Sequence, residues 1–324
     1  MLKRAEGNEV ICASIEKAAE ILPQFKNIAC SISGGKDSDI MLDLIWNLDT
    51  DKKVRYIWFD TGMEYKATKD HLKYLEDKYN IAIERIKAIK SIPKSVKEYG
   101  QPFVSKNVSE TIYGMQKRGF KFEDGEFADL ANKYPDIMSY VRWWVNGYQY
   151  DSSLYNIEYN KYLKEFMTTT PPEFRISAHC CNYAKKNLSK KFVKDNNIDL
   201  MITGIRKIEG GVRSAKYKSC FTNENAKAAY RPLLWYLNSD EREYDELFEI
   251  KHSDCYEVWG FKRTGCVGCP FNQNVFNDLE IVEKYEPNMA KAARTIFKDS
   301  YEYTKAYRDF CKETKELNNP NKKE

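Results

Sequence analysis

Short apolar segments alternate with amphipathic segments from residue 28 to residue 89. Three apolar segments have the length of buried strands: IACSIS (28–33), VRYIWFD (54–60) and IAIERIKAI (81–89). The segments between them, DIMLDLIWNL (39–48) and KATKDHLKYLEDKY (66–79), place their large apolar residues at helical spacing. Strands separated by helices predict right-handed β–α–β units, and therefore an α/β fold built on a parallel sheet.

The pattern changes from about residue 101 to residue 175, where the sequence is aromatic and charged and has few β-branched runs. We interpret this segment as a helical insertion that covers the sheet or the substrate. Alternation returns with IDLMITGIR (198–206), which reads as another strand. The chain is therefore expected to consist of the first part of a sheet domain (1–100), the insertion (101–175), and the rest of the domain with a C-terminal helix (176–324).

Composition and charge narrow the class of protein. The chain has 324 residues, of which 31% are charged and 14% aromatic, with a net charge of +4. This composition excludes disorder and low complexity. No apolar run approaches membrane-spanning length, and the start MLKRAEGNEV lacks the apolar core of a secretion signal. We expect a cytoplasmic enzyme with no membrane partner, whose nine cysteines stay reduced.

The segment SISGGKDSDI (31–40) joins the first expected strand to the first expected helix. Backbone amides of such a loop and the N-terminus of the following helix point at one spot, which suits phosphate. Gly34 and Gly35 permit close backbone approach, and Lys36 adds a positive charge. It is not a Walker A loop, since Cys30 and Asp37 stand where that motif needs Gly and Ser or Thr. The simpler interpretation is a glycine turn followed by a helix cap.

Two further polar turns follow expected strands. DTGMEY (60–65) follows the second strand, and TGIRKIEGGVRSAKYKSC (203–220) follows the strand at 198–206. The carboxyl ends of parallel strands are where ligands bind in such sheets. In the second turn, Arg206 and Arg213 suit bidentate binding of phosphate or sulfate. Surface arginines in a loop are the simpler interpretation.

The spacing of the cysteines indicates a metal site. AHCCNYAKK supplies Cys180 and Cys181, and RTGCVGCPF supplies Cys266 and Cys269. Four thiolates bind zinc or an iron–sulfur cluster. The adjacent pair favours a cubane cluster, because neighbouring residues strain to chelate one tetrahedral ion, and Pro270 after the last cysteine is typical of ferredoxins. In the simpler alternative, Cys180 or Cys181 is a buried apolar residue.

These motifs together resemble the phosphoadenosine phosphosulfate (PAPS) reductase family of adenine-nucleotide α-hydrolase-like, or PP-loop, proteins. SGGKDS (33–38) is similar to the family's pyrophosphate loop, and FDTGMEY to its DTG-x-E segment. TGIRKIEGGVR is similar to the GIR-x-x-E-S-x-x-R turn, although Gly210 replaces the usual serine. The cysteine pairs resemble those that hold a 4Fe-4S cluster in the adenylyl-sulfate reductase branch. YRPLLWYLNSDEREYDELFE stands where the family has P-x-x-x-W-x-x-x-D-V-W, but matches it poorly.

The resemblance implies a parallel-sheet PP-loop fold and assigns roles to single residues. Lys36 and the loop amides would neutralise phosphate, Asp37 would orient magnesium or water, and Arg206 with Arg213 would hold the sulfate or terminal phosphate. The implied metal ligands are Cys180, Cys181, Cys266 and Cys269 around a 4Fe-4S cluster, and Mg²⁺ would accompany ATP. The implied nucleotide-binding residues are Ser33, Gly34, Gly35, Lys36, Asp37, Ser38, Asp60, Thr61, Gly62, Glu64, Gly204, Arg206 and Glu209.

The leading expectation is reductive release of sulfite from PAPS or adenylyl sulfate (APS), with a thiol or thioredoxin-type reductant. One departure counts against the usual cycle: reductases of this family carry a nucleophilic cysteine in a Glu-Cys-Gly-x-His tail, whereas Cys311 lies in RDFCKETKE. The first alternative is ATP-dependent transfer of sulfur to DNA or RNA through an adenylated intermediate. KKNLSKKFVK (185–194) would suit a nucleic-acid backbone, although a solvated helix face is the simpler interpretation. The second alternative is a non-catalytic nucleotide-sensing module.

Overall fold

The computed structural model describes residues 1–145, 156–210, 217–224 and 227–318. The chain forms two compact units, each of which is discontinuous in sequence. The first unit consists of Met1–Ile89 and Tyr183–Cys266, and the second of Lys90–Asn182 and Val267–Glu324. This grouping differs from three consecutive parts divided near residues 100 and 175, because the C-terminal helices fold with the insertion and not with the sheet.

The first unit contains a six-stranded sheet in the order β3-β2-β1-β4-β6-β5. All neighbouring strands are parallel except β5 and β6, which are antiparallel. The predicted α/β fold with a parallel sheet is therefore confirmed. The strands are β1 (Ile28–Ser31), β2 (Val54–Asp60), β3 (Ile83–Lys87), β4 (Leu200–Thr203), β5 (Phe221–Glu224) and β6 (Lys227–Tyr230).

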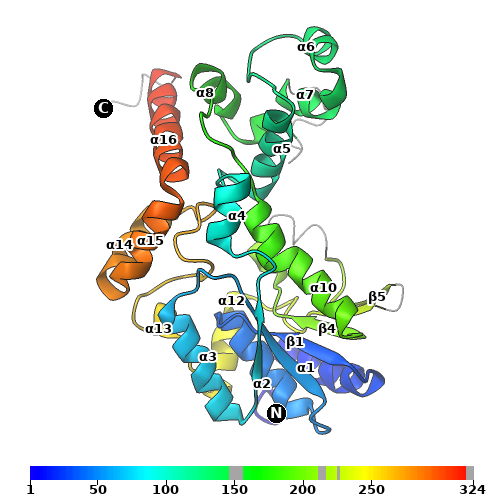
Figure 1. The fold of residues 1–324 in the computed structure, drawn as a ribbon. Coiled ribbons are helices and arrows are strands. Elements are labelled where there is room, and N and C mark those ends of the chain that lie inside the picture. Colours follow the sequence, from blue (N-terminus) through cyan, green and yellow to red (C-terminus); the bar gives the residue numbers. More distant parts are fainter. Residues whose placement is uncertain (146–155, 211–216, 225–226, 319–324) are drawn as a thin grey trace. The chain divides into compact units, whose positions relative to one another are not determined.

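Helices cover both faces of this sheet (Figure 1). On β1, Ile28 and Cys30 pack into the core that includes α1, α2 and α3, whereas Ala29 packs on the opposite face with Phe192 of α10. Residues that alternate along a strand point to opposite faces, so a strand covered on both sides is apolar throughout. The helices of this unit are α1 (Glu9–Ile21), α2 (Lys36–Leu48), α3 (Lys66–Tyr79), α10 (Asn187–Asp195), α12 (Asn238–Phe248) and α13 (Asp254–Glu257), with short turns η1 (Leu22–Gln24), η4 (Asn182–Lys186) and η5 (Lys207–Glu209).

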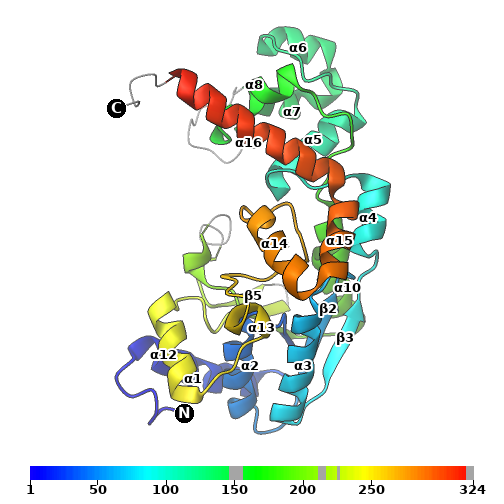
Figure 2. The same ribbon diagram turned by 90° about the vertical axis from the view of Figure 1, so that its left-hand side faces the viewer.

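The described part of the second unit is helical, as expected for the insertion, apart from one isolated bridge between Gln101 and Ile176. Its core is aromatic: Phe166 of α8 packs against Tyr303 of α16 at 4.9 Å between ring centroids. Figure 2 shows α8 beside α16. The helices are α4 (Ile92–Tyr99), α5 (Lys106–Lys117), α6 (Phe127–Lys133), α7 (Met138–Trp144), α8 (Leu163–Thr169), α9 (His179–Cys181), α14 (Val275–Tyr285), α15 (Pro287–Ile296) and α16 (Lys298–Asn318), with η2 (Pro135–Ile137) and η3 (Ile157–Tyr159).

Across the residues described, no helix is both long enough and apolar enough to span a membrane.

Candidate functional site

The expected phosphate loop lies between β1 and α2 and is folded around Ser38. The Ser38 hydroxyl donates to the carbonyl oxygen of Gly35 at 2.8 Å and accepts the backbone N–H groups of Ser33 at 3.2 Å and Gly35 at 3.1 Å. Because α2 begins at Lys36, Lys36 and Asp37 belong to the first helical turn and are only partly exposed, whereas the sequence had suggested a loop up to Ser38. The positive end of the α2 dipole therefore faces the turn.

Two glycines allow the backbone around this loop to pack closely. Gly34 has a φ of +70°, in the left-handed region, and a Cβ there would lie 2.8 Å from the Thr68 methyl carbon. Gly204 follows β4, and a Cβ on it would lie 3.0 Å from the carbonyl oxygen of Asp37. The absence of a side chain at Gly204 thus lets the end of β4 approach the first turn of α2.

The close approach of β4 to α2 places Arg206 beside the loop. Its Nε lies 2.6 Å from Oδ1 of Asp37 and its Nη2 2.9 Å from Oε2 of Glu241, while Nη1 donates to Asn238 at 3.0 Å. Only 11% of the Arg206 side chain is exposed. Burial raises the pKa of Asp37 to about 7, and the charge of Arg206 opposes that rise. The structure therefore brings together two residues that were predicted from distant parts of the sequence.

A cavity of about 960 Å³ opens at this position. Its charged lining comprises six basic and four acidic side chains: Lys36, Lys185, Arg206, Arg242, Lys262, Arg263, Asp37, Glu209, Glu241 and Asp245. It lies where β1 and β4 adjoin. From β1 the sheet continues through β2 and β3 towards one edge, whereas β4, β6 and β5 lie towards the other edge. This is the topological switch point at which open α/β sheets bind ligands. The volume and excess of basic groups suit a polyanion of nucleotide size.

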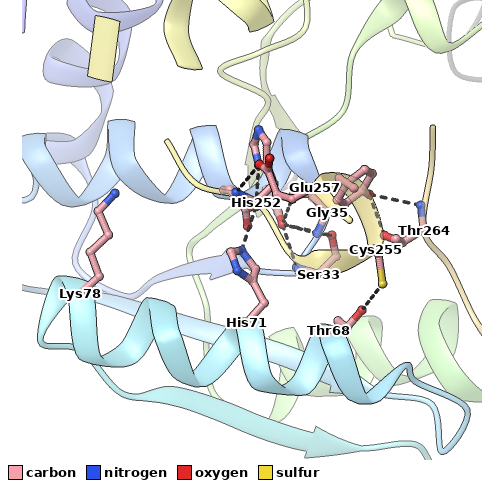
Figure 3. A network of polar contacts seen from close by, with 12 residues as sticks. Ser33, Gly35, Thr68, His71, Lys78, His252, Cys255, Glu257 and Thr264 are labelled. Atoms are coloured by element: carbon pink, nitrogen blue, oxygen red, sulfur yellow. Dashed lines mark hydrogen bonds and ion pairs between the residues drawn. The ribbon is translucent and has the colours of Figure 1, made fainter. Parts of the chain in front are cut away.

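The part of the cavity rim that adjoins the loop comes from α13 and the segment after it. Lys36 Nζ lies 5.4 Å from the centroid of the Tyr256 ring, within cation–π distance. The Tyr256 hydroxyl lies 2.7 Å from Oγ1 of Thr264, and burial raises the pKa of this tyrosine to about 12. Figure 3 shows Thr264 close to Gly35 and Ser33 of the loop. Tyr256 is thus neutral near pH 7 and forms an uncharged wall beside Lys36.

The DTG-x-E segment forms a tight buried turn after β2. Asp60 accepts the Gly62 N–H at 2.9 Å and Arg85 Nε at 2.7 Å. Glu64 accepts the backbone N–H of Thr61 at 3.0 Å and its hydroxyl at 2.6 Å. None of the four predicted residues Asp60, Thr61, Gly62 and Glu64 lines the cavity described above. The carboxylates of Asp60 and Glu64 shape the turn, and contact of this segment with the nucleotide stays a prediction.

The four predicted cluster ligands are distributed over both units. Cys180 is buried and Cys181 partly buried on α9, Cys269 follows Gly268 in a turn of the second unit, and Cys266 is the last residue of the first unit. Cys266 Sγ lies 3.6 Å from the hydroxyl oxygen of Thr61. No group of three or more His, Cys, Asp or Glu side chains within the described ranges is arranged to hold a metal ion. A cluster ligand set therefore stays a prediction from the sequence.

The turn after β4 is only partly described. Glu209 lines the cavity and has an oxygen 3.4 Å from Arg263. Arg213, the second predicted anion-binding arginine, lies outside the described residues.

Several cavity residues were not predicted from the sequence, and most of them lie on α12 or in the loop after α13. On α12 they are Asn238, Glu241, Arg242 and Asp245. Glu241 and Asp245 are four residues apart, so they share one face of the helix. The sequence signal that could have identified these α12 residues was this spacing of acidic residues, which lies in the segment that matches the family motif poorly. The loop of Gly260–Thr264 carries no comparable signal.

Comparisons with known proteins agree with part of this description. Residues 27–119 match the phosphoadenosine phosphosulfate reductase domain, a segment that includes the loop and the DTG turn. Arg206 and the four cysteines lie outside it. No curated protein matches the sequence.

Solved structures show distant likeness only. PAPS reductase from Candida auris is 14% identical, with 82% of this chain and 93% of that chain covered and a TM-score of 0.42. FMN adenylyltransferase from Candida glabrata is 12% identical (82% and 65% covered, TM-score 0.41). The U34-tRNA thiolase NcsA from Methanococcus maripaludis, solved with its [4Fe-4S] cluster, is 14% identical (89% and 79% covered, TM-score 0.39).

Proposed function

We propose that this protein is an adenine-nucleotide enzyme of sulfur chemistry that releases sulfite from APS or PAPS with electrons from a dithiol of the thioredoxin type. The observation that carries the proposal is the convergence of the phosphate loop and Arg206 on one basic cavity at the switch point of the sheet. The match of residues 27–119 to the PAPS reductase domain supports the same substrate class.

In this proposal, the first unit binds the anionic end of the substrate. The loop amides and Lys36 neutralise the phosphate, and Arg206 exchanges one of its carboxylate partners for the sulfate or phosphate oxygen. A thiolate of the reductant attacks the sulfate sulfur, and the bond from that sulfur to the phosphate oxygen breaks. The nucleotide leaves with the oxygen, and Arg206 with Lys36 stabilises the charge that develops there.

A second displacement releases sulfite and oxidises the reductant. The second thiolate of the reductant attacks the sulfur of the S-sulfonated thiol, sulfite leaves with the bonding electron pair, and the dithiol becomes a disulfide. We propose the dithiol as an external reactant because of the environment of Cys311. This cysteine lies within α16, its Sγ is 3.8 Å from the carbonyl oxygen of Lys161, and burial raises the pKa of its thiol. A raised pKa reduces the thiolate fraction at neutral pH.

A 4Fe-4S cluster on Cys180, Cys181, Cys266 and Cys269 is part of this proposal and is supported by their spacing in the sequence. No step above is assigned to the cluster.

The position of Cys311 within α16 also favours a second candidate, ATP-dependent sulfur transfer to a nucleic acid. This reaction does not need the cysteine-containing Glu-Cys-Gly-x-His tail of the reductases. An acceptor oxygen would attack the α-phosphate of ATP and release pyrophosphate, and a sulfide or persulfide donor would then displace AMP. Lys185 lines the cavity, and on α10 beside it Lys190, Lys191 and Lys194 are exposed. Basic side chains that continue from a cavity would suit a phosphodiester backbone.

Parallel binding and turnover measurements on anaerobically purified protein test the proposal. We expect Lys36→Ala to weaken binding of ATP, APS or PAPS by about tenfold, because a charge-assisted contact to phosphate is lost. Lys73→Ala removes an exposed lysine of α3 and is the matched control. Equal affinity in Lys36→Ala and wild type would return the loop to the role of a helix cap.

The products then distinguish the reactions. Sulfite released from APS or PAPS with a dithiol supports the first candidate, and Cys311→Ser should retain that activity. ATP cleaved to AMP and pyrophosphate only with nucleic acid present supports the second. Nucleotide binding without turnover of any of these substrates would indicate a sensing module.

A further inference from the structure

Two of the three histidines of the chain contact one buried carboxylate oxygen. His71 Nε2 lies 3.0 Å and His252 Nδ1 2.9 Å from Oδ2 of Asp39. The other ring nitrogen of His252, Nε2, lies 3.0 Å from Oδ2 of Asp245. Figure 3 shows His71 and His252 at this network, His71 reaching it from α3. Asp39 is fully buried, and His252 is 4% exposed. The imidazole of His252 therefore bridges two carboxylates inside the protein.

This bridge joins the same two helices that Arg206 joins. Asp39 lies on α2, two residues after Asp37, and Asp245 lies on α12, one turn after Glu241. Arg206 contacts Asp37 and Glu241, so two cations link α2 to α12 at successive levels.

The two links differ in their exposure to a ligand. Arg206 and Asp245 line the cavity, whereas His252 does not. An anion in the cavity competes with Asp37 and Glu241 for Arg206 and so weakens the link that Arg206 makes between the two helices. Because His252 does not line the cavity, the link through its imidazole can hold the two helices together while Arg206 contacts the anion.

His252 contacts both carboxylates, whereas His71 contacts Asp39 alone. Oδ1 of Asp39 and Oδ1 of Asp245 are buried and have no hydrogen-bond partner in the described structure. Without a cation between them, two carboxylates would face each other in a low-dielectric interior, which is unfavourable. Only the doubly protonated imidazolium can donate to both at once.

The surrounding groups favour that protonated form. Burial lowers the pKa of His252, but its hydrogen bonds to Asp245 and Asp39 and their charges outweigh burial and raise it to about 9. On α13, Glu257 accepts the backbone N–H of His252 at 3.2 Å, and the Tyr256 ring lies 6.0 Å away. From α3, His71 shares Asp39, and the Tyr74 ring stacks on His71. Lys251 precedes His252, with its Nζ over the ring of Tyr74.

We propose that His252 is a positioning residue for the phosphate-binding cavity: its imidazolium holds α12 against the start of α2, so that Arg206 stays beside the cavity between these helices when an anion displaces one of its carboxylate partners. The identity of that anion rests on the proposed function, whereas the link between the helices does not.

Nucleotide affinity as a function of pH tests the proposal. For wild type we expect ATP affinity to fall as the pH rises from 8 to 10, because His252 loses the proton that joins the helices. His252→Gln, with a neutral side chain that cannot donate to both carboxylates in this way, should bind ATP about tenfold more weakly at pH 7.5 and lose that alkaline dependence. Glu257→Gln removes an adjacent exposed charge without touching the ring, so it should behave as wild type.

An NMR titration of the histidine imidazoles tests the link between α2 and α12 without any nucleotide. One resonance should titrate near pH 9 and be missing from His252→Gln. If that variant does not fold, Asp245→Asn should move the same resonance towards the ordinary value near 6.5, because one of the two carboxylate partners is neutralised. Titration of His252 near 6.5 in wild type, or an unchanged pH profile of binding in His252→Gln, would overturn the proposal. Failure of wild type to bind ATP, APS or PAPS would instead contradict the proposed function, and the NMR result would still decide the link.

Discussion

Arg206 is a buried guanidinium shared between carboxylates on two helices, Asp37 on α2 and Glu241 on α12. A ligand anion must compete with those carboxylates, so the affinity of the site depends on their charge. The pKa of Asp37, raised to about 7 by burial, places that charge change near neutral pH. Below pH 7 Asp37 is neutral and Arg206 is more available to an anion, whereas above pH 7 Asp37 is ionised and competes.

We therefore predict that wild type binds ATP roughly fivefold more tightly at pH 6 than at pH 8, the size expected from one partly shielded charge near the phosphates. Asp37→Asn should lose this dependence, because asparagine does not titrate. Calorimetry on both proteins at each pH separates the effect from titration of ATP, which is common to them. The same slope in both proteins would show that Asp37 does not set the charge of the site.

At the scale of elements, the site depends on how closely β4 and α2 approach. Gly204, directly after β4, lies against the backbone of Asp37. This contact sets the distance between the turn that carries Arg206 and the helix that carries Lys36. Since the neighbouring atom is backbone, a side chain at Gly204 can be accommodated only by moving the helix start or the turn.

We predict that Gly204→Ala weakens ATP binding by about tenfold and lowers the free energy of unfolding by about 1 kcal/mol, as for mild overpacking. The added Cβ would lie 3.0 Å from the Asp37 carbonyl oxygen. Gly265→Ala is the matched control, since nothing lies within 4 Å of a Cβ there. Isothermal calorimetry and urea denaturation measure the two effects. An affinity equal to that of Gly265→Ala would mean that the close approach is not needed for binding.

At the scale of the whole molecule, the chain forms a sheet unit and a helical unit, and it passes from one unit to the other three times. The phosphate loop, Arg206 and the His252 bridge all lie in the first unit. Three of the predicted cluster ligands belong to the second unit and Cys266 ends the first.

We predict that anaerobically purified protein is brown and contains about four irons per chain. Serine variants of Cys180, Cys181, Cys266 and Cys269 should each reduce the iron content, because each removes one thiolate. Cys311→Ser is the control and should retain the iron. Iron and acid-labile sulfide analysis, together with absorption spectra, measure the outcome. Stoichiometric zinc without iron, in protein produced with iron available, would contradict the cluster.

The local pattern of the sequence was sufficient to predict the parallel sheet, the strand at 54–60, the helix at 66–79 and the glycine turn that begins at Ser33. These features depend on alternation, helical spacing and glycine conformation, all of which act over a few neighbouring residues. It also indicated that Arg206 lies at the carboxyl end of a strand. The helix start at Lys36 was less well predicted, because Ser38 caps the turn from within the helix.

Only the tertiary structure revealed the partners of Arg206 and the role of the histidines. Glu241, His71 and His252 are common polar residues in unremarkable helical or loop segments, and their burial together with long-range pairing gives them a special chemistry. Whether a carboxylate is paired, and whether a histidine is charged, depends on groups separated by up to 213 residues along the chain. Local periodicity determines elements, whereas long-range packing determines desolvation and pairing. The sequence was therefore sufficient to predict the loop at which we propose that an anion binds, whereas the fold decided which charges hold Arg206 beside that loop.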